Sequence, residues 1–183
     1  MADVHGIEAR GLVRTFKDVN AVQGITSAVK AANPDATITF DACGTSTGTA
    51  TPASCSAQTT AAIKTADLVV VFAGTDDTVA TEGKDRTSIA MPGNYDSLID
   101  QVAAAGNPRT ALAVQSGGAV SLAHAKNLPA VVFSAYNGES QGTALAYVLF
   151  GKQNPSGHLN FTWYADDTQL PDMKNYGLTP SQT

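Results

Sequence analysis

The apolar run at residues 68–72, LVVVF, constrains the fold more than any other stretch of the sequence. A strand-forming run with no polar alternation is typical of a strand that is covered on both faces, so we expect it in the middle of a parallel sheet. Gly74 ends the run and opens a long loop. Ligands of open α/β sheets collect at the carboxyl ends of the strands, where this loop begins. Its charged residues include Asp76, Asp77, Glu82, Asp85 and Arg86.

Strands and helices alternate along the rest of the chain. Apolar residues at three- and four-residue steps predict helices, and short β-branched or aromatic runs predict strands. The expected helices cover residues 16–32, 56–66, 95–105 and 141–150, with one or two helical turns within 120–126. The other expected strands cover residues 36–40, 110–114, 129–133, which reads as a further buried strand, and 159–163 as the last strand.

This alternation, with connections of ten or more residues, predicts parallel strands joined by right-handed crossovers. The expected fold is α/β: a three-layer α/β/α sandwich with a mainly parallel, flavodoxin-like sheet. We place one domain at residues 16–164, an irregular N-terminal segment at 1–15 and a surface tail at 165–183. No glycine-rich dinucleotide or phosphate loop follows any strand, which disfavours a flavodoxin-like cofactor module, and we expect no cofactor.

The charge of the chain argues against two classes of partner. Its formal net charge is −5, with eleven Lys and Arg and no basic run. Nucleic acid and anionic membranes are therefore not expected as partners, and a neutral ligand fits better. The three histidines lie far apart and give no metal-ligand spacing with the two cysteines, so no metal is expected.

The two cysteines, Cys43 and Cys55, flank a loop of small and hydroxylated residues. A disulfide between them would close this loop and imply an oxidising compartment. The alternative is two unrelated thiols, because spacing does not prove connectivity. We favour the disulfide.

Several separate stretches of the sequence together carry a family resemblance. They are ADLVVVFAGTDDT at 66–78, TEGKDRTSIAMPGN at 81–94 with LIDQV at 98–102, AVQSGGAV at 113–120 and YNGESQGTALAYVLFGKQNPSGHLNFTWY at 136–164. In this order they resemble the C-terminal α/β sandwich domain of glycoside hydrolase family 3. The last stretch is the most specific, because few α/β families place a Gly-Glu helix start, LFG and NPSG at this spacing. The tail at 170–183 resembles that of secreted enzymes of the family that act on xylan.

The resemblance implies a retaining exo-β-glycosidase of the β-xylosidase or β-glucosidase type. In the family the nucleophile is an aspartate on an N-terminal (β/α)8 barrel, and the loop matched by TEGKDR supplies the general acid/base, which maps onto Glu82. No part of the chain looks like that barrel, so we expect one domain of a larger secreted enzyme, inactive alone. Its expected partners are the barrel and a β-linked xylo- or gluco-oligosaccharide.

Retaining hydrolysis needs two carboxyl groups about 5 to 5.5 Å apart, one as nucleophile and one as proton donor. Glu82 suits the second role, because its side chain is long and its loop can reach outward. Partial burial and the charge of the nucleophile would keep such a donor protonated near neutral pH. The alternatives are that Glu82 is an ordinary solvated carboxylate, or that the chain is a non-catalytic carbohydrate-binding or interaction domain.

For each of the remaining candidate residues, the sequence allows a structural role as well as a functional one. We expect Asp85 and Arg86 to brace the loop as a pair rather than contact sugar. Asp76 and Asp77 either cap the loop, which we favour, or bind a substrate hydroxyl. At the exit of a neighbouring strand, Tyr136 and Asn137 either line a sugar subsite or plug the edge of the sheet. Glu139 reads as a helix-start carboxylate, and Trp163 as core or interface packing.

Overall fold

The computed structural model describes residues 10–13, 19–48 and 51–170. Within them, five strands form one sheet in the order β2-β1-β3-β4-β5, and every neighbouring pair is parallel. The strands are β1 (Arg10–Val13), β2 (Thr39–Asp41), β3 (Val69–Gly74), β4 (Thr110–Gln115) and β5 (Ala130–Phe133).

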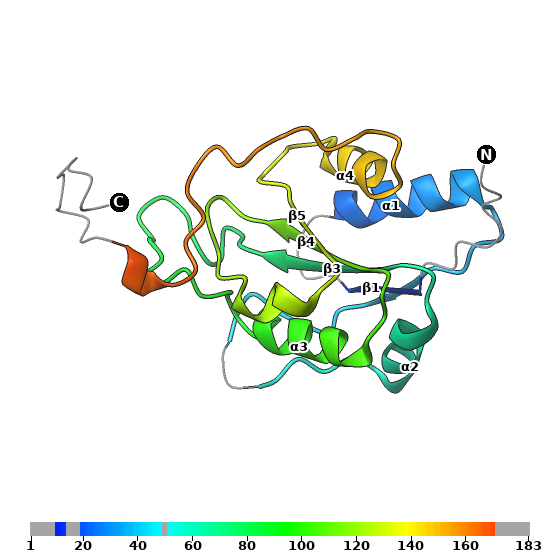
Figure 1. Cartoon of the computed structure of the whole chain (residues 1–183), viewed down its shortest axis with the longest axis horizontal. Coiled ribbons are helices and arrows are strands. Elements are labelled where there is room, and N and C mark those ends of the chain that lie inside the picture. The colour runs from blue at the N-terminus through cyan, green and yellow to red at the C-terminus, as the bar shows by residue number, and fades with distance from the viewer. Residues whose placement is uncertain (1–9, 14–18, 49–50, 171–183) are drawn as a thin grey trace.

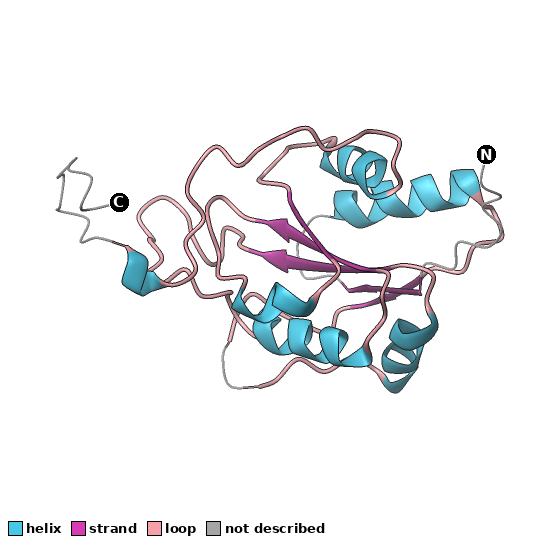
Figure 2. Ribbon diagram, viewed as in Figure 1, coloured by secondary structure: helices cyan, strands magenta, loops and turns pink. Residues whose placement is uncertain are grey.

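Helices cover both faces of the sheet, which confirms the three-layer sandwich (Figures 1 and 2). One face carries α1 (Val19–Ala32) and α4 (Gln141–Leu149). The other carries α2 (Ala57–Thr65), α3 (Tyr95–Ala105) and the short 3-10 helix η1 (Ala123–Asn127). A second 3-10 helix, η2 (Asp167–Gln169), lies near the end of the described chain. No helix in the described residues is both long and apolar enough to cross a membrane.

The central strand is β3, as predicted, and all of its residues are buried. It pairs with β4 along its whole length, from Val69 opposite Thr110 to Gly74 opposite Gln115. Successive side chains of a strand point to opposite faces. Val69, Val71 and Ala73 pack towards α2 and α3, whereas Val70 and Phe72 pack towards α1 and α4. The apolar run is unbroken because both faces of β3 are covered.

The helices expected at 56–66, 95–105 and 141–150 form within one residue of these bounds. The helix expected at 16–32 is described from Val19 to Ala32, since 16–18 lie outside the described residues, and the turns expected within 120–126 form η1. Asn33 and Pro34 follow the end of α1, and the Ser56 hydroxyl caps α2 by accepting the Thr59 amide at 3.1 Å. Gly106 ends α3 in the left-handed conformation, with φ of +72°. A disulfide joins Cys43 and Cys55, whose Cα atoms are 4.4 Å apart, as favoured from the sequence.

Four expectations differ from the structure. The strand expected at 36–40 forms later in the chain, as β2 at Thr39–Asp41. Arg10–Val13, within the expected irregular segment, forms β1, which gains parallel partners on both sides that local sequence does not reveal. Residues 159–163 are not a strand. Instead Trp163 donates its indole N–H to the Val120 carbonyl at 2.8 Å and stacks on Phe161.

The prediction that the strand at 129–133 is buried is also wrong. In β5, Ala130 and Val131 are exposed, and the last two residues are half-buried. Among the described strands, β5 pairs only with β4 and therefore forms an edge of the sheet. Residues 1–9, 14–15 and 171–183, which belong to the expected N-terminal segment and tail, lie outside the described residues.

Candidate functional site

We call residues 75–94, between β3 and α3, the acidic loop. It starts from a buried hydroxyl cluster at the carboxyl ends of β3 and β4. The Thr75 amide donates to the Gln115 carbonyl at 2.9 Å, and Thr75 Oγ1 lies 3.0 Å from Ser116 Oγ. The Tyr136 hydroxyl lies 2.6 Å from the same Thr75 oxygen, while much of the Tyr136 side chain is exposed. The start of the acidic loop is thus fixed to three neighbouring strand ends.

Asp76 caps the first turn of the acidic loop. Its Oδ1 accepts the backbone amide of Thr78 at 2.9 Å, and its carbonyl accepts the amides of Val79 and Ala80 at 3.0 Å. Its Oδ2 accepts the Ser46 hydroxyl at 2.8 Å. Partial burial disfavours the charged form, but the hydrogen bonds from Thr78 and Ser46 outweigh it and lower the pKa of Asp76. Asp76 therefore acts as a capping carboxylate, the reading that the sequence favoured.

Glu82 lies at the tip of the acidic loop. Thr81 and Lys84 exchange backbone hydrogen bonds of 3.2 and 2.9 Å, which closes a tight turn with Glu82 and Gly83 at its centre. Gly83 has φ of +77°, the conformation that such a turn requires of its second central residue. The Glu82 side chain is exposed, and its carboxylate has no hydrogen-bond or ion-pair partner among the described residues. It is therefore available to a surface that faces the loop.

Arg86 braces the acidic loop, but not through Asp85. Its guanidinium donates to the Ala90 carbonyl at 2.6 Å and to the Ala119 carbonyl at 3.3 Å. Burial lowers the pKa of Arg86, and the nearby charge of Asp167 opposes that effect. Asp85 is exposed and makes no such bond within the described chain, so the expected Asp85–Arg86 pair does not form.

Asp167 anchors the far part of the acidic loop. Its Oδ2 accepts the Ser88 hydroxyl at 2.5 Å, and its Oδ1 accepts the Ile89 amide at 2.7 Å. These bonds lower the pKa of the Asp167 carboxyl. A segment about eighty positions downstream in the chain therefore holds the loop beside Arg86.

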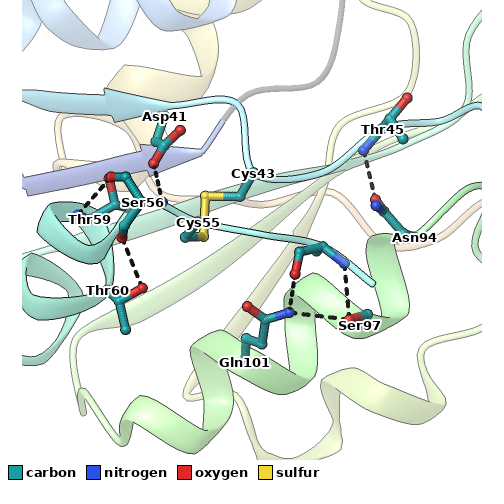
Figure 3. Close-up of a disulfide and its surroundings, with 11 residues drawn as sticks. Asp41, Cys43, Thr45, Cys55, Ser56, Thr59, Thr60, Asn94, Ser97 and Gln101 are labelled. Atoms are coloured by element: carbon teal, nitrogen blue, oxygen red, sulfur yellow. Dashed lines mark hydrogen bonds between the residues drawn. A yellow bond between two sulfur atoms is a disulfide. The ribbon is translucent and has the colours of Figure 1, made fainter. Parts of the chain in front are cut away.

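The acidic loop ends against the disulfide loop, which we define as residues 44–48 and 51–54 between the bonded cysteines (Figure 3). The Asn94 side-chain oxygen accepts the Thr45 backbone N–H at 2.8 Å, and the Asn94 backbone N–H donates to the Thr45 carbonyl at 3.1 Å. Gly93, with φ of +62°, packs so closely that an added Cβ would lie 1.8 Å from the Thr45 oxygen. Only glycine fits there.

Of the other candidate residues, Asn137 and Glu139 lie at the exit of β5 or just beyond it, and Asp77 lies in the acidic loop. The Asn137 amide donates to the Ser134 hydroxyl at 2.6 Å and to its carbonyl at 3.0 Å, so it holds its own turn. Glu139 is exposed, just before α4, and Asp77 is exposed beside Asp76. No group of His, Cys, Asp and Glu in the described part of the chain could hold a metal ion. The acidic loop is thus the feature that presents a carboxylate outward from a braced base.

Comparison with known proteins identifies the family. The model of the glycosyl hydrolase family 3 C-terminal domain matches residues 6–182, nearly the whole chain. The chain belongs to this family. A probable exo-1,4-β-xylosidase from Aspergillus fumigatus is 39% identical over 145 residues, which are 76% of this chain and 18% of that protein. A probable β-D-xylosidase 6 from Arabidopsis thaliana is 39% identical over 122 residues, 63% of this chain and 15% of that protein.

Solved structures of the family share the fold. The crystal structure of a family 3 β-glucosidase from Bifidobacterium adolescentis matches with a TM-score of 0.59 and 30% identity, over 70% of this chain and 19% of that one. The family 3 domain described here thus spans less than a fifth of the length of these relatives.

Sequence reasoning missed three residues of the family 3 domain that hold the acidic loop: Ser46, Thr75 and Asp167. Ser46 and Asp167 bond to the loop across long stretches of chain, and no local pattern marks such contacts. Thr75 could have been identified from the sequence, because it directly follows the central strand at the edge where ligands collect.

Proposed function

We propose that this family 3 domain supplies the general acid/base of a retaining exo-β-glycosidase that removes terminal β-xylosyl or β-glucosyl residues. Glu82 is the acid/base. The nucleophile is an aspartate on a barrel domain outside this chain, and the substrate is a β-linked xylo- or gluco-oligosaccharide, such as those released from xylan. The observation that carries the proposal is an exposed glutamate, without a partner among the residues that the structure describes, at the tip of a loop whose base is held by hydrogen bonds.

The role of Glu82 divides into two steps. In the first, its carboxyl group donates a proton to the glycosidic oxygen while the nucleophile attacks the anomeric carbon. In the second, the carboxylate takes a proton from the water that hydrolyses the glycosyl-enzyme. A proton donor at neutral pH needs partial burial and a nearby negative charge. Because Glu82 is exposed in this domain, the facing barrel would supply both.

The arrangement at the base of the loop supports this reading. An acid/base has to be held within a fraction of an ångström of its working position, and rigid support is the usual means. Asp76, Arg86 and Asn94 each fix a different part of the acidic loop, so the tip can reach outward from a fixed frame. The disulfide supports a secreted location, because such bonds persist in oxidising compartments.

The test is to combine this chain with the barrel domain of a family 3 β-xylosidase that lacks its own C-terminal domain. Turnover of aryl β-xylosides and β-glucosides with poor leaving groups is measured for the native domain and for Glu82→Gln. We expect turnover only when both domains are present and a loss of about 100-fold or more in Glu82→Gln, the scale of general acid catalysis. Aryl glycosides with good leaving groups need little protonation, so their glycosylation step is expected to be affected far less.

Glu139→Gln is the matched control. This substitution also replaces an exposed carboxylate near the carboxyl ends of the strands, but the carboxylate lies just before a helix. We expect it to retain native turnover. Equal turnover of poor leaving groups by Glu82→Gln and the native domain would overturn the assignment.

A further inference from the structure

The disulfide loop contacts both ends of the acidic loop through two adjacent residues. Ser46 donates its hydroxyl to Asp76 Oδ2 at 2.8 Å, where the acidic loop starts. Thr45 exchanges two hydrogen bonds with Asn94, where the acidic loop ends. The two ends of the loop that carries Glu82 are therefore held by neighbouring positions of one separate segment.

That segment is itself fixed to α3 (Figure 3). The Ala53 amide donates to the Ser97 hydroxyl at 3.2 Å, and the Gln101 side chain donates to the Ala53 carbonyl at 2.6 Å. Gly44 lies so close to α3 that an added Cβ would be 3.0 Å from the buried Leu98 side chain. Because the disulfide joins its two ends, the disulfide loop can serve as a rigid support rather than as a flexible connection.

A continuous series of hydrogen bonds leads from Ser46 to the tip of the acidic loop. Ser46 bonds to Asp76, and Asp76 bonds to the Thr78 amide. The Thr78 carbonyl accepts the ammonium group of Lys84, and the Lys84 amide closes the turn around Glu82 by donating to the Thr81 carbonyl at 2.9 Å. The first bond joins two side chains, the next two join a side chain to the backbone, and the last joins backbone to backbone. We therefore expect a displacement at Ser46 to reach the turn around Glu82.

We propose that Ser46 is a positioning residue that fixes the direction in which the Glu82 turn leaves the sheet. It acts through Asp76 and does not touch substrate. The inference about catalysis rests on the proposed role of Glu82, whereas the mechanical link between Ser46 and the turn does not. Ser46 would therefore influence turnover without belonging to the site that binds sugar.

The mechanical link is tested on the full chain by amide hydrogen exchange. The amides that report are those of Thr78, Val79, Ala80, Thr81 and Lys84, which are all bonded within the acidic loop. We expect Ser46→Ala to speed their exchange by about fivefold, the factor that corresponds to a net hydrogen bond of about 1 kcal/mol. Ser46→Thr keeps the hydroxyl and is expected to restore native exchange.

Thr47→Ala is the matched control. It removes a hydroxyl from the next position, where Thr47 Oγ1 bonds only to Thr45 within the described chain. We expect its exchange rates in the acidic loop to equal the native ones. Denaturant midpoints are measured for every variant, so that general unfolding is recognised by faster exchange in β3 and β4 as well. Native exchange rates in a folded Ser46→Ala would overturn the proposal.

The consequence for catalysis is tested in the complex with the barrel domain. We expect Ser46→Ala to lower kcat for poor leaving groups several-fold with KM unchanged, because the misaimed acid/base acts only in the transition state. A change in KM alone would contradict positioning. The two proposals fail separately. Native turnover in Glu82→Gln overturns the proposed function but leaves the exchange result intact. Unchanged exchange in Ser46→Ala overturns the mechanical link even when Glu82→Gln has lost its turnover.

Discussion

The base and the tip of the acidic loop differ in burial and in the segments that they contact. At the base, Thr75 is buried, and Asp76 and Asn94 each make hydrogen bonds to other segments. At the tip, Glu82 and Gly83 are exposed and belong to a turn that, among the described residues, forms hydrogen bonds only within its own loop. This comparison indicates that the residues that hold the loop in place and the residue that we propose for catalysis lie in different parts of the same loop. Substitutions that remove contacts at the base should cost more stability than substitutions at the tip, and replacing Glu82 should chiefly alter turnover.

The largest effect is expected from a pair of glycine substitutions. Gly93 and Gly83 both have positive φ, but an added Cβ overlaps the Thr45 backbone at Gly93 and meets nothing within 4 Å at Gly83. Gly93→Ala should lower the free energy of unfolding by about 4 kcal/mol, from left-handed strain together with overpacking. Gly83→Ala should cost about 1 kcal/mol, from strain alone. Denaturant unfolding measures both, and equal losses would remove the distinction between base and tip.

The disulfide comes next in size. Replacing Cys43 and Cys55 together by Ser should lower the free energy of unfolding by about 3 kcal/mol, because the open chain gains conformational freedom in the unfolded state. The disulfide supports the base through Thr45 and Ser46, so amide exchange should rise there as well. Native stability in the double variant would show that the base does not depend on this bond.

A smaller effect is expected from the ionisation of Asp76. Its folded-state pKa is lowered, so its carboxylate stabilises the protein above about pH 4, and this contribution is lost as the pH falls through the folded pKa. Asp76→Asn should therefore be less stable than the native protein at pH 6, by under about 1 kcal/mol because the side chain is partly exposed. The difference should shrink towards zero near pH 2. Unfolding curves recorded across this range test the sign, and a difference that grows in acid would contradict it.

The smallest effect on stability is expected at the tip. Glu82→Gln should change the free energy of unfolding by less than about 0.5 kcal/mol, as is usual for an exposed side chain, and Glu82 has no partner in the described part of the chain. The same variant should lose turnover of poor leaving groups in the complex with the barrel. A large loss of stability would mean that the tip is part of the folded framework and would remove the contrast.

Much of the fold could be predicted because its signals are local. The apolar run of β3 and the glycine after α3 each act within a few residues of the chain. The exposure of β5 could not be predicted, since 129–133 is as apolar as a central strand, and only its place in the sheet leaves it uncovered. The same limit hid β1, whose four residues are ordered by partners on both sides.

The candidate site divides in the same way. The acidic loop and Glu82 could be located from the strand that precedes them and from the family resemblance. The supports of Arg86 could not, because the Ala119 carbonyl and Asp167 are brought to it by distant segments. The sequence suggested the adjacent Asp85 as the partner, but neighbouring residues on an extended loop point away from each other more readily than towards each other.

The position of β1 has a practical consequence for anyone who wishes to produce this domain. Among the described strands, β1 is the sole link between β2 and the rest of the sheet. A recombinant version cloned from residue 16, where the sequence places the domain boundary, would leave β2 unpaired and open a long flat edge along β3. Such edges invite aggregation. A recombinant version of the domain therefore has to keep Arg10–Val13.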